Sequence, residues 1–321
     1  MVTFNPEAET IANKMASPIL KWAGGKRQLL DELYARFPKS YAHFHEPFFG
    51  GGALFFDLEP DNGSINDTNP RLINFYRQVR DRPEELITRL RSFDDPESDP
   101  ESNLQFAESN RKGKMIKNYY YQQRERFNNR PYGDDFDELE EAALLLYLNR
   151  TCYNGLYREN STGGFNVPIG RYSNPDWVRA EEIRTASGVL NNIEIHNTDF
   201  GYVSDEVEEG DLVYFDPPYE PMSPTASFND YSKEGFGKED QERLLELAQE
   251  LDRRGVDVIL SNSGVMYEMY NEAGFYVEKE GATRAINSDA SNRDEVDEIV
   301  ATNVSHAKRR QAGQQGLADF N

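Results

Sequence analysis

Short apolar runs alternate with amphipathic segments along most of the chain, a pattern typical of strands that alternate with helices. One helix is predicted to start at Pro70, and another to cover residues 238–255 and end at Gly255. This order predicts an α/β fold built on a mainly parallel sheet. The predicted strands lie within segments 41–56, 63–69, 193–199, 210–219 and 256–263.

The alternation is interrupted between residues 75 and 173. This stretch contains an acidic loop at 92–110, an apolar helix at 140–149 and a region rich in Tyr, Arg and Asn. It predicts a mainly helical second domain inserted into the α/β domain. We therefore expect a first α/β part at 1–74, the insert at 75–173, a second α/β part at 174–305 and a flexible tail at 306–321.

Composition narrows the class of protein. Hydrophobic residues make up 37% of the chain, which is enough for a packed core. No run of about 18 apolar residues occurs and the first residues lack an apolar signal segment, so a cytoplasmic protein is expected. The single cysteine, Cys152, excludes intrachain disulfides and multi-cysteine metal sites. The four histidines are dispersed, so no metal site is predicted.

The formal net charge is −22, and Arg outnumbers Lys. Such a charge by itself argues against nucleic-acid binding. Many carboxylates with few lysines also suit a protein that stays soluble at very high salt, so we expect a halophilic source, with an ordinary acidic protein as the alternative. Two segments, 14–39 and 107–131, are nevertheless net positive. They are either solvated helix faces or anion-binding surfaces.

Three consecutive glycines, Gly50 to Gly52, follow the first predicted strand and let the backbone approach a ligand closely. Asp67 ends the next strand, where an acid in nucleotide-binding α/β folds binds a ribose diol. Phe55 stands where a dinucleotide fingerprint would have its last glycine, so a pyrophosphate is not clearly provided for. The pattern indicates either a nucleoside-containing cofactor or a tight structural turn.

A Pro-Pro turn follows the apolar strand LVYF, in the order Asp216, Pro217, Pro218, Tyr219. Such a turn is rigid and presents a carboxylate, a carbonyl oxygen and an aromatic ring at the ligand-binding end of the sheet. The exocyclic amine of a nucleobase needs two acceptors and a stacking surface. The turn therefore indicates chemistry on a base amine, and the structural alternative is a rigid turn with a surface tyrosine.

Several segments together resemble the Dam family of DNA adenine-N6 methyltransferases, the GATC-modifying enzymes of the D12 class. They occur in the family's order and span residues 17–303. The resemblance implies a Rossmann-like methyltransferase sheet with an inserted target-recognition domain. The matching segments are LKWAGGK (20–26), EPFFGGGALFF (46–56), INDTNPRLINFY (65–76), LYLNRTCYNGLYREN (146–160), GFNVPIGRY (164–172), VYFDPPYEPMSPTASFNDYSKEGF (213–236), LSNS (260–263) and RAINSDASNRDEVDEI (284–299).

The resemblance also implies S-adenosylmethionine as the methyl donor and double-stranded DNA as the substrate, without a metal. The implied catalytic residues are Asp216, Pro217, Pro218 and Tyr219. The implied cofactor-binding residues are Trp22, Lys26, Gly50, Gly51, Gly52, Asp67, Asp199, Phe200 and Asp216. The implied DNA-facing residues are Lys21, Tyr153, Asn154, Leu156, Arg158, Pro168, Arg171 and Tyr172.

The implied reaction needs no covalent enzyme intermediate. Asp216 and the Pro217 carbonyl accept the two amine hydrogens of a flipped adenine, and Tyr219 stacks on its ring. The nitrogen lone pair then attacks the methyl group in line, helped by positioning and electrostatics.

Two departures and several alternatives qualify this reading. The chain is acidic at 92–110 and reads NRDE at 292–295, where relatives tend to be basic, so phosphate contacts are expected to be weak and activity to be best in molar salt. The alternatives are a nicotinamide-type oxidoreductase, a non-catalytic DNA-binding protein on the same fold, and an adenine methyltransferase with another target motif. A monomer is expected, and a restriction nuclease of the same specificity is a candidate partner.

Overall fold

The computed structural model describes residues 16–93, 112–129, 137–172, 174–219, 236–280 and 298–309. These residues fall into two compact units. The helical unit comprises Met1–Gly25, Gly50–Glu59 and Pro70–Asn192, and the sheet unit comprises Lys26–Phe49, Pro60–Asn69 and Ile193–Asn321. The predicted acidic loop, from residue 94 onward, and the acidic segment 292–295 lie outside the described residues.

The sheet unit contains a seven-stranded sheet in the order β3-β2-β1-β4-β5-β7-β6. The pairs among β1 to β5 are parallel, and β7 pairs antiparallel with both β5 and β6. A mixed α/β fold with a mostly parallel sheet is thereby confirmed. The strands are β1 (Phe44–Glu46), β2 (Gly63–Asn66), β3 (Ile193–His196), β4 (Leu212–Phe215), β5 (Asp257–Ser263), β6 (Tyr276–Glu280) and β7 (Glu298–Thr302).

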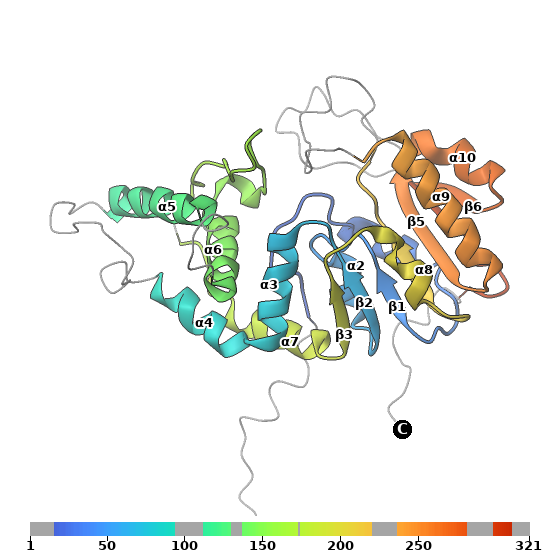
Figure 1. Ribbon diagram of the computed structural model, residues 1–321, viewed down its shortest axis with the longest axis horizontal. Coiled ribbons are helices and arrows are strands. Elements are labelled where there is room, and N and C mark those ends of the chain that lie inside the picture. Colours follow the sequence, from blue (N-terminus) through green and yellow to red (C-terminus); the bar gives the residue numbers. More distant parts are fainter. Residues whose placement is uncertain are drawn as a thin grey trace, which may run out of the picture. The chain divides into compact units, whose positions relative to one another are not determined.

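Every residue of β4, β5 and β7 is buried, so these strands do not alternate between buried and exposed positions. Helices α8 (Val203–Glu206), α9 (Lys238–Arg253) and α10 (Tyr267–Glu272) share one apolar core with these strands. Figure 1 shows α9 and α10 alongside β5 and β6. Shorter elements of the unit are η1 (Arg27–Leu29), α1 (Leu30–Tyr34), η5 (Phe200–Tyr202) and η7 (Gly264–Met266).

The helical unit packs its helices around α6 (Glu138–Thr151), which contains the predicted apolar segment 140–149. Asp137 caps this helix, because its side chain accepts hydrogen bonds from the backbone N–H groups of Leu139 and Glu140. The other helices are α2 (Ala53–Leu58), α3 (Pro70–Asp81), α4 (Pro83–Ser92), α5 (Lys112–Asn129), η4 (Tyr153–Gly155) and α7 (Ala180–Leu190).

Two buried carboxylates on α6 form ion pairs with arginine side chains of neighbouring helices. Glu140 pairs with Arg89 of α4 and Arg126 of α5, and Glu141 lies 3.4 Å from Arg71 of α3. Arg126 belongs to the net-positive segment 107–131, so at least this charge of the segment is used inside the unit.

The predicted functional division at residues 75 and 173 stays a prediction, because compactness alone does not show which residues recognise a target. In the predicted tail, Arg309 is buried and pairs with Glu278 at 3.0 Å, so order extends at least to this residue. The rest of the tail lies outside the described residues. Among the helices that the structure describes, none is long and apolar enough to cross a membrane.

Candidate functional site

The Pro-Pro turn begins where β4 ends, at the carboxyl edge of the parallel strands. Asp216 is partly buried, Pro217 is buried and Pro218 is exposed. Phe215 pairs with Leu260 in β5, so Asp216 and Ser261 are the next residues of two neighbouring strands. The Ser261 hydroxyl donates to Asp216 Oδ1 at 2.8 Å, and Ser261 Oγ also lies 2.9 Å from the Tyr214 hydroxyl. The carboxylate is therefore held from the sheet itself.

An ammonium group and a second carboxylate complete this cluster. Lys26 Nζ lies 3.3 Å from Asp216 Oδ1 and 3.6 Å from Glu298 Oε1, and it donates to the Tyr219 hydroxyl. The Tyr219 hydroxyl in turn donates to Glu298 Oε1 at 3.0 Å. Lys26 and Glu298 are only 7% and 6% exposed. The structure thus brings together Lys26, Asp216 and Tyr219, as predicted, and adds Glu298, which the sequence did not indicate.

Burial raises the pKa of the Asp216 carboxyl, and the nearby Glu298 carboxylate raises it further. The Lys26 ammonium and the Ser261 hydroxyl oppose this change without cancelling it. A carboxylate with a raised pKa is a stronger hydrogen-bond acceptor when ionised. Among the described residues, the two polar contacts of the Asp216 side chain, from Ser261 and Lys26, are both made to Oδ1.

Two other predicted acids end neighbouring strands of the same sheet. Asp67 follows β2, and its Oδ1 accepts the backbone N–H of Asn69 at 2.8 Å. Asp199 comes after β3, and its Oδ1 accepts the N–H of Gly201 at 2.9 Å. These local turns fix both carboxylates at the carboxyl edge of the sheet, where α/β folds bind ligands.

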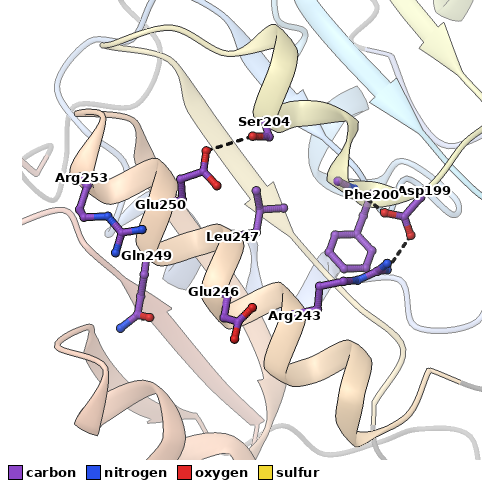
Figure 2. A pocket seen from close by; sticks show the side chains of 10 residues that line it. Asp199, Phe200, Ser204, Arg243, Glu246, Leu247, Gln249, Glu250 and Arg253 are labelled. Carbon is purple, nitrogen blue, oxygen red and sulfur yellow. Dashed lines mark hydrogen bonds and ion pairs between the residues drawn. The ribbon is translucent and has the colours of Figure 1, made fainter.

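A residue that sequence reasoning missed holds the Asp199–Phe200 pair. Arg243 of α9 lies 2.6 Å from Asp199 Oδ2, and its guanidinium carbon lies 4.3 Å from the centre of the Phe200 ring. Figure 2 shows this arrangement, with the Arg243 side chain reaching from the helix to both residues. Phe200 itself is buried and packs against Phe48.

A pocket of about 500 Å³ lies among η5, α8 and α9 (Figure 2). Asp216 and Lys26 do not line it, so it borders the Asp199–Phe200 pair without containing the Pro-Pro turn. Its lining residues are Asp199, Phe200, Gly201, Ser204, Arg243, Glu246, Leu247, Gln249, Glu250 and Arg253.

The other predicted cofactor-binding residues, Trp22 and Gly50 to Gly52, belong to the helical unit. Gly50 and Gly52 have φ values of 49° and 65°, a left-handed conformation that favours glycine. A Cβ on Gly51 would lie 2.9 Å from the Cβ of Trp22, so only glycine fits there. The Trp22 ring stacks on Tyr157 with 5.0 Å between centroids. Trp22 and the glycine turn therefore pack against each other.

The predicted DNA-facing residues begin with Lys21 and Tyr172. The backbone N–H and C=O of Lys21 each bond to the Asn149 side chain at 2.8 Å. Its ammonium donates to the Tyr172 hydroxyl at 3.2 Å and lies 4.7 Å from the centre of that ring. Gly155 lies so close that a Cβ there would be 2.3 Å from the Lys21 side chain.

Tyr153 is 47% exposed, and Leu156 is partly buried. The backbone N–H of Tyr153 donates to the Pro168 carbonyl at 2.8 Å, and this bond joins two predicted DNA-facing segments. Asn154 has φ 55°, and Arg158 donates to Asn166 at 2.7 Å. The exposed predicted residues are Tyr153, Asn154, Arg158, Pro168, Arg171 and Tyr172.

One possible set of metal ligands occurs among the described residues. Glu194, His196 and Glu206 have ligand atoms within 4.8 Å of one another. Glu194 is exposed, and His196 Nε2 lies 3.5 Å from its carboxylate and 3.2 Å from that of Glu206.

Comparison with known proteins agrees with this geometry. Residues 22–286 match the model of the family described as D12 class N6 adenine-specific DNA methyltransferase. The chain is 44% identical over 293 residues to the Type II methyltransferase M1.LlaDCHI of Lactococcus lactis subsp. cremoris, covering 90% of this chain and 96% of the relative.

More distant relatives match over similar lengths. The chain is 38% identical to the Type II methyltransferase M.MjaIII of Methanocaldococcus jannaschii, over 89% of this chain and 98% of that protein. It is 35% identical to the DNA adenine methylase of Escherichia coli K12, over 88% and 93%. The chain therefore belongs to the D12 class of N6 adenine-specific DNA methyltransferases, whose methyl donor is S-adenosylmethionine.

Proposed function

We propose that this adenine-specific DNA methyltransferase acts on an adenine flipped out of duplex DNA, within the sequence GATC. The observation that carries the mechanism is the Asp216 carboxylate, which Ser261 and Lys26 hold through Oδ1. Its Oδ2 is then the acceptor for one amine hydrogen of the target adenine, and the Pro217 carbonyl accepts the other. These bonds favour a pyramidal nitrogen whose lone pair points at the methyl group.

Base flipping follows from this assignment, because the adenine amine is paired inside a duplex and cannot reach two acceptors on a protein turn. Lys26 Nζ donates to the Tyr219 hydroxyl and lies 4.2 Å from the centre of its ring. We assign the Tyr219 ring to stack on the flipped adenine. Stacking of this kind contributes about 1–3 kcal/mol per base.

The cofactor residues suit a nucleoside with a sulfonium group, which supplies an electrophilic methyl carbon. Asp67 suits the ribose diol, and Asp199 suits the adenine amine, since each is a carboxylate at the carboxyl edge of the sheet. The glycine turn beside Trp22 gives the backbone close access to the methionine part. Lys26 holds Asp216 in place.

We assign target recognition to the exposed residues of the helical unit, together with Lys21 and Leu156. Arg158 and Arg171 can bind guanine in the major groove, and Leu156 and Pro168 can contact a thymine methyl. We assign Tyr153 and Asn154 to the space that a flipped base leaves. The sequence GATC itself rests on the resemblance of these segments to the Dam family.

Methyl transfer to short duplexes tests both parts of this proposal. One duplex carries GATC, and the others replace one of its outer bases on both strands. Transfer to GATC alone supports the assignment. Arg158→Ala should then lower the preference for GATC by about tenfold or more, since a guanine contact is worth about 1–3 kcal/mol. Equal transfer to all duplexes would contradict the proposed recognition while leaving the adenine chemistry intact.

We further propose that the enzyme works as a monomer in the cytoplasm, one strand at a time. Two relatives are named Type II methyltransferases, which supports a companion restriction nuclease of the same specificity. Sedimentation of the enzyme on a single GATC duplex tests the stoichiometry, and a 2:1 complex at saturation would contradict the monomer.

A further inference from the structure

A buried carboxylate beyond the Pro-Pro turn contacts the site from another strand. Glu298 is the first residue of β7, which runs antiparallel to β5, and it pairs in register with Ser263. Its Oε1 accepts the Tyr219 hydroxyl at 3.0 Å and lies 3.6 Å from Lys26 Nζ. One oxygen atom thus contacts both the aromatic residue and the cation of the site.

Lys26 stands between two carboxylates at nearly equal distances. The separations are 3.3 Å to Asp216 and 3.6 Å to Glu298, and both Lys26 and Glu298 are shielded from solvent. The two attractions are therefore similar in size and little screened by salt. An ammonium group paired with Asp216 Oδ1 alone would withdraw more charge from the carboxylate and weaken Oδ2 as an acceptor. Glu298 shares the ammonium group and reduces this effect.

We propose that Glu298 is a positioning residue for methyl transfer. It fixes the Tyr219 ring through the hydroxyl and shares the Lys26 ammonium, so that Asp216 remains available to the adenine amine. This inference rests on the proposed roles of Asp216 and Tyr219. It assigns no contact between Glu298 and the substrate.

The test measures the single-turnover rate of methyl transfer at saturating S-adenosylmethionine and saturating duplex, together with the Kd for each and the thermal midpoint. Glu298→Gln keeps the shape of the side chain and removes its charge. We expect the transfer rate to fall about tenfold or more, as for loss of a preorganised polar group, with both Kd values within about twofold.

The matched control is Glu278→Gln on the adjacent strand β6, which removes ion pairs with Arg36 and Arg309. It should lower the thermal midpoint and leave the transfer rate unchanged.

A double variant with Lys26 tests whether Glu298 acts on the transfer rate by positioning Lys26 or only stabilises the fold. If Glu298 acts by sharing the ammonium group, Lys26→Met combined with Glu298→Gln should be no slower than Lys26→Met alone, because the two changes remove one interaction. Additive losses would contradict this route. The fluorescence of 2-aminopurine at the target position, read in the same variants, reports whether the flipped base is held differently.

Several outcomes would overturn the inference. A Glu298→Gln enzyme that transfers methyl groups at the wild-type rate, with only a lower thermal midpoint, makes Glu298 structural. If that variant does not fold, the transfer rate of Glu298→Asp is measured instead. An unchanged rate in that variant would equally contradict a positioning role for Glu298. A wild-type enzyme that methylates DNA in these assays without enhanced 2-aminopurine fluorescence would instead refute the proposed base flipping.

Discussion

At the residue scale, the central feature is that Asp216, the proposed catalytic carboxylate, is held in an environment that disfavours its charge. Burial raises the pKa of Asp216 although Lys26 lies nearby. An acid whose pKa is higher in the folded than in the unfolded chain contributes stability at low pH, and this contribution is lost as pH rises through the folded pKa. Ionisation of Asp216 in the folded chain therefore costs stability in exchange for acceptor strength.

Asp216→Asn should raise the thermal midpoint at about pH 7, because the amide keeps the shape and removes the buried charge. The difference should shrink as pH falls toward the ordinary aspartate pKa of 3.8, where both side chains are neutral. Thermal unfolding across this pH range measures the effect, with the exposed Glu268→Gln as a control that should change little. A lower midpoint for Asp216→Asn at neutral pH would contradict the argument.

Asp216→Ala removes the acceptor altogether. We expect methyl transfer at saturating S-adenosylmethionine to fall by about 10²–10³, the loss typical of a preorganised polar group. The Kd for S-adenosylmethionine should also rise, because Asp216 is among the predicted cofactor-binding residues. Single-turnover transfer and calorimetric binding measure the two effects separately. A variant that still methylates at a comparable rate would refute the proposed acceptor.

Arg243 offers a second test at this scale. Its pair with Asp199 is about half exposed, so it should be weak and sensitive to salt. Arg243→Ala should weaken S-adenosylmethionine binding about two- to fivefold at low salt and hardly at all at about 1 M KCl. Arg253→Ala, on the same helix and pocket, is the control. Equal losses at both salt concentrations would show that Arg243 acts through packing on Phe200 instead.

The site shows what residue patterns can and cannot reveal. Asp216 and Tyr219 were predictable because a Pro-Pro turn after a buried strand is a local signal. Ser261 had a weaker signal, since it continues the strand beside β4 and begins a polar run. Glu298 lies in the matching segment 284–299, but nothing distinguishes it from the other acids there, and only the antiparallel pairing of β7 with β5 brings it to Tyr219.

At the element scale, the sequence predicted the strands and helices that have strong patterns and missed the connections that depend on tertiary structure. The helix starting at Pro70 runs to Asp81, and the helix predicted over 238–255 spans Lys238–Arg253. The antiparallel strands β6 and β7 were not predicted. The strands that pair with them are determined by the tertiary structure, and a local sequence pattern carries no information about such pairing.

Helix α6 makes a prediction about stability. Glu140 is 5% exposed and serves Arg89 of α4 and Arg126 of α5. Glu140→Gln leaves two guanidinium groups without their carboxylate, so unfolding free energy should fall by about 3–5 kcal/mol. Urea denaturation measures this loss. Glu85→Gln on α4, which breaks an exposed pair with Arg82, should leave the unfolding free energy nearly unchanged. Similar small losses for both would contradict a supporting role of the buried network.

At the scale of the whole molecule, the net charge of −22 has to be reconciled with a DNA substrate. Self-repulsion at low salt destabilises a strongly charged chain, and repulsion from phosphates weakens DNA binding. Both effects are screened at high salt. We propose that the protein comes from a halophile and that base contacts and stacking carry most of its DNA affinity.

This proposal predicts a salt profile for activity and stability. Methylation of DNA and the thermal midpoint should both rise between about 0.1 M and about 1 M KCl. Tritium transfer to plasmid DNA and thermal unfolding measure the two curves. A maximum of activity near about 0.1 M, with none at high salt, would refute the halophilic reading.

The most direct test of the account is to map methylation on genomic DNA that lacks it, after treatment with the enzyme and S-adenosylmethionine in about 1 M KCl. We predict N6-methyladenine at every GATC and almost nowhere else. N6-methyladenine in another sequence would retain the chemistry of Asp216 and contradict the recognition assigned to Tyr153 through Tyr172. No methylation at any salt concentration would contradict the central claim that this site transfers a methyl group to adenine.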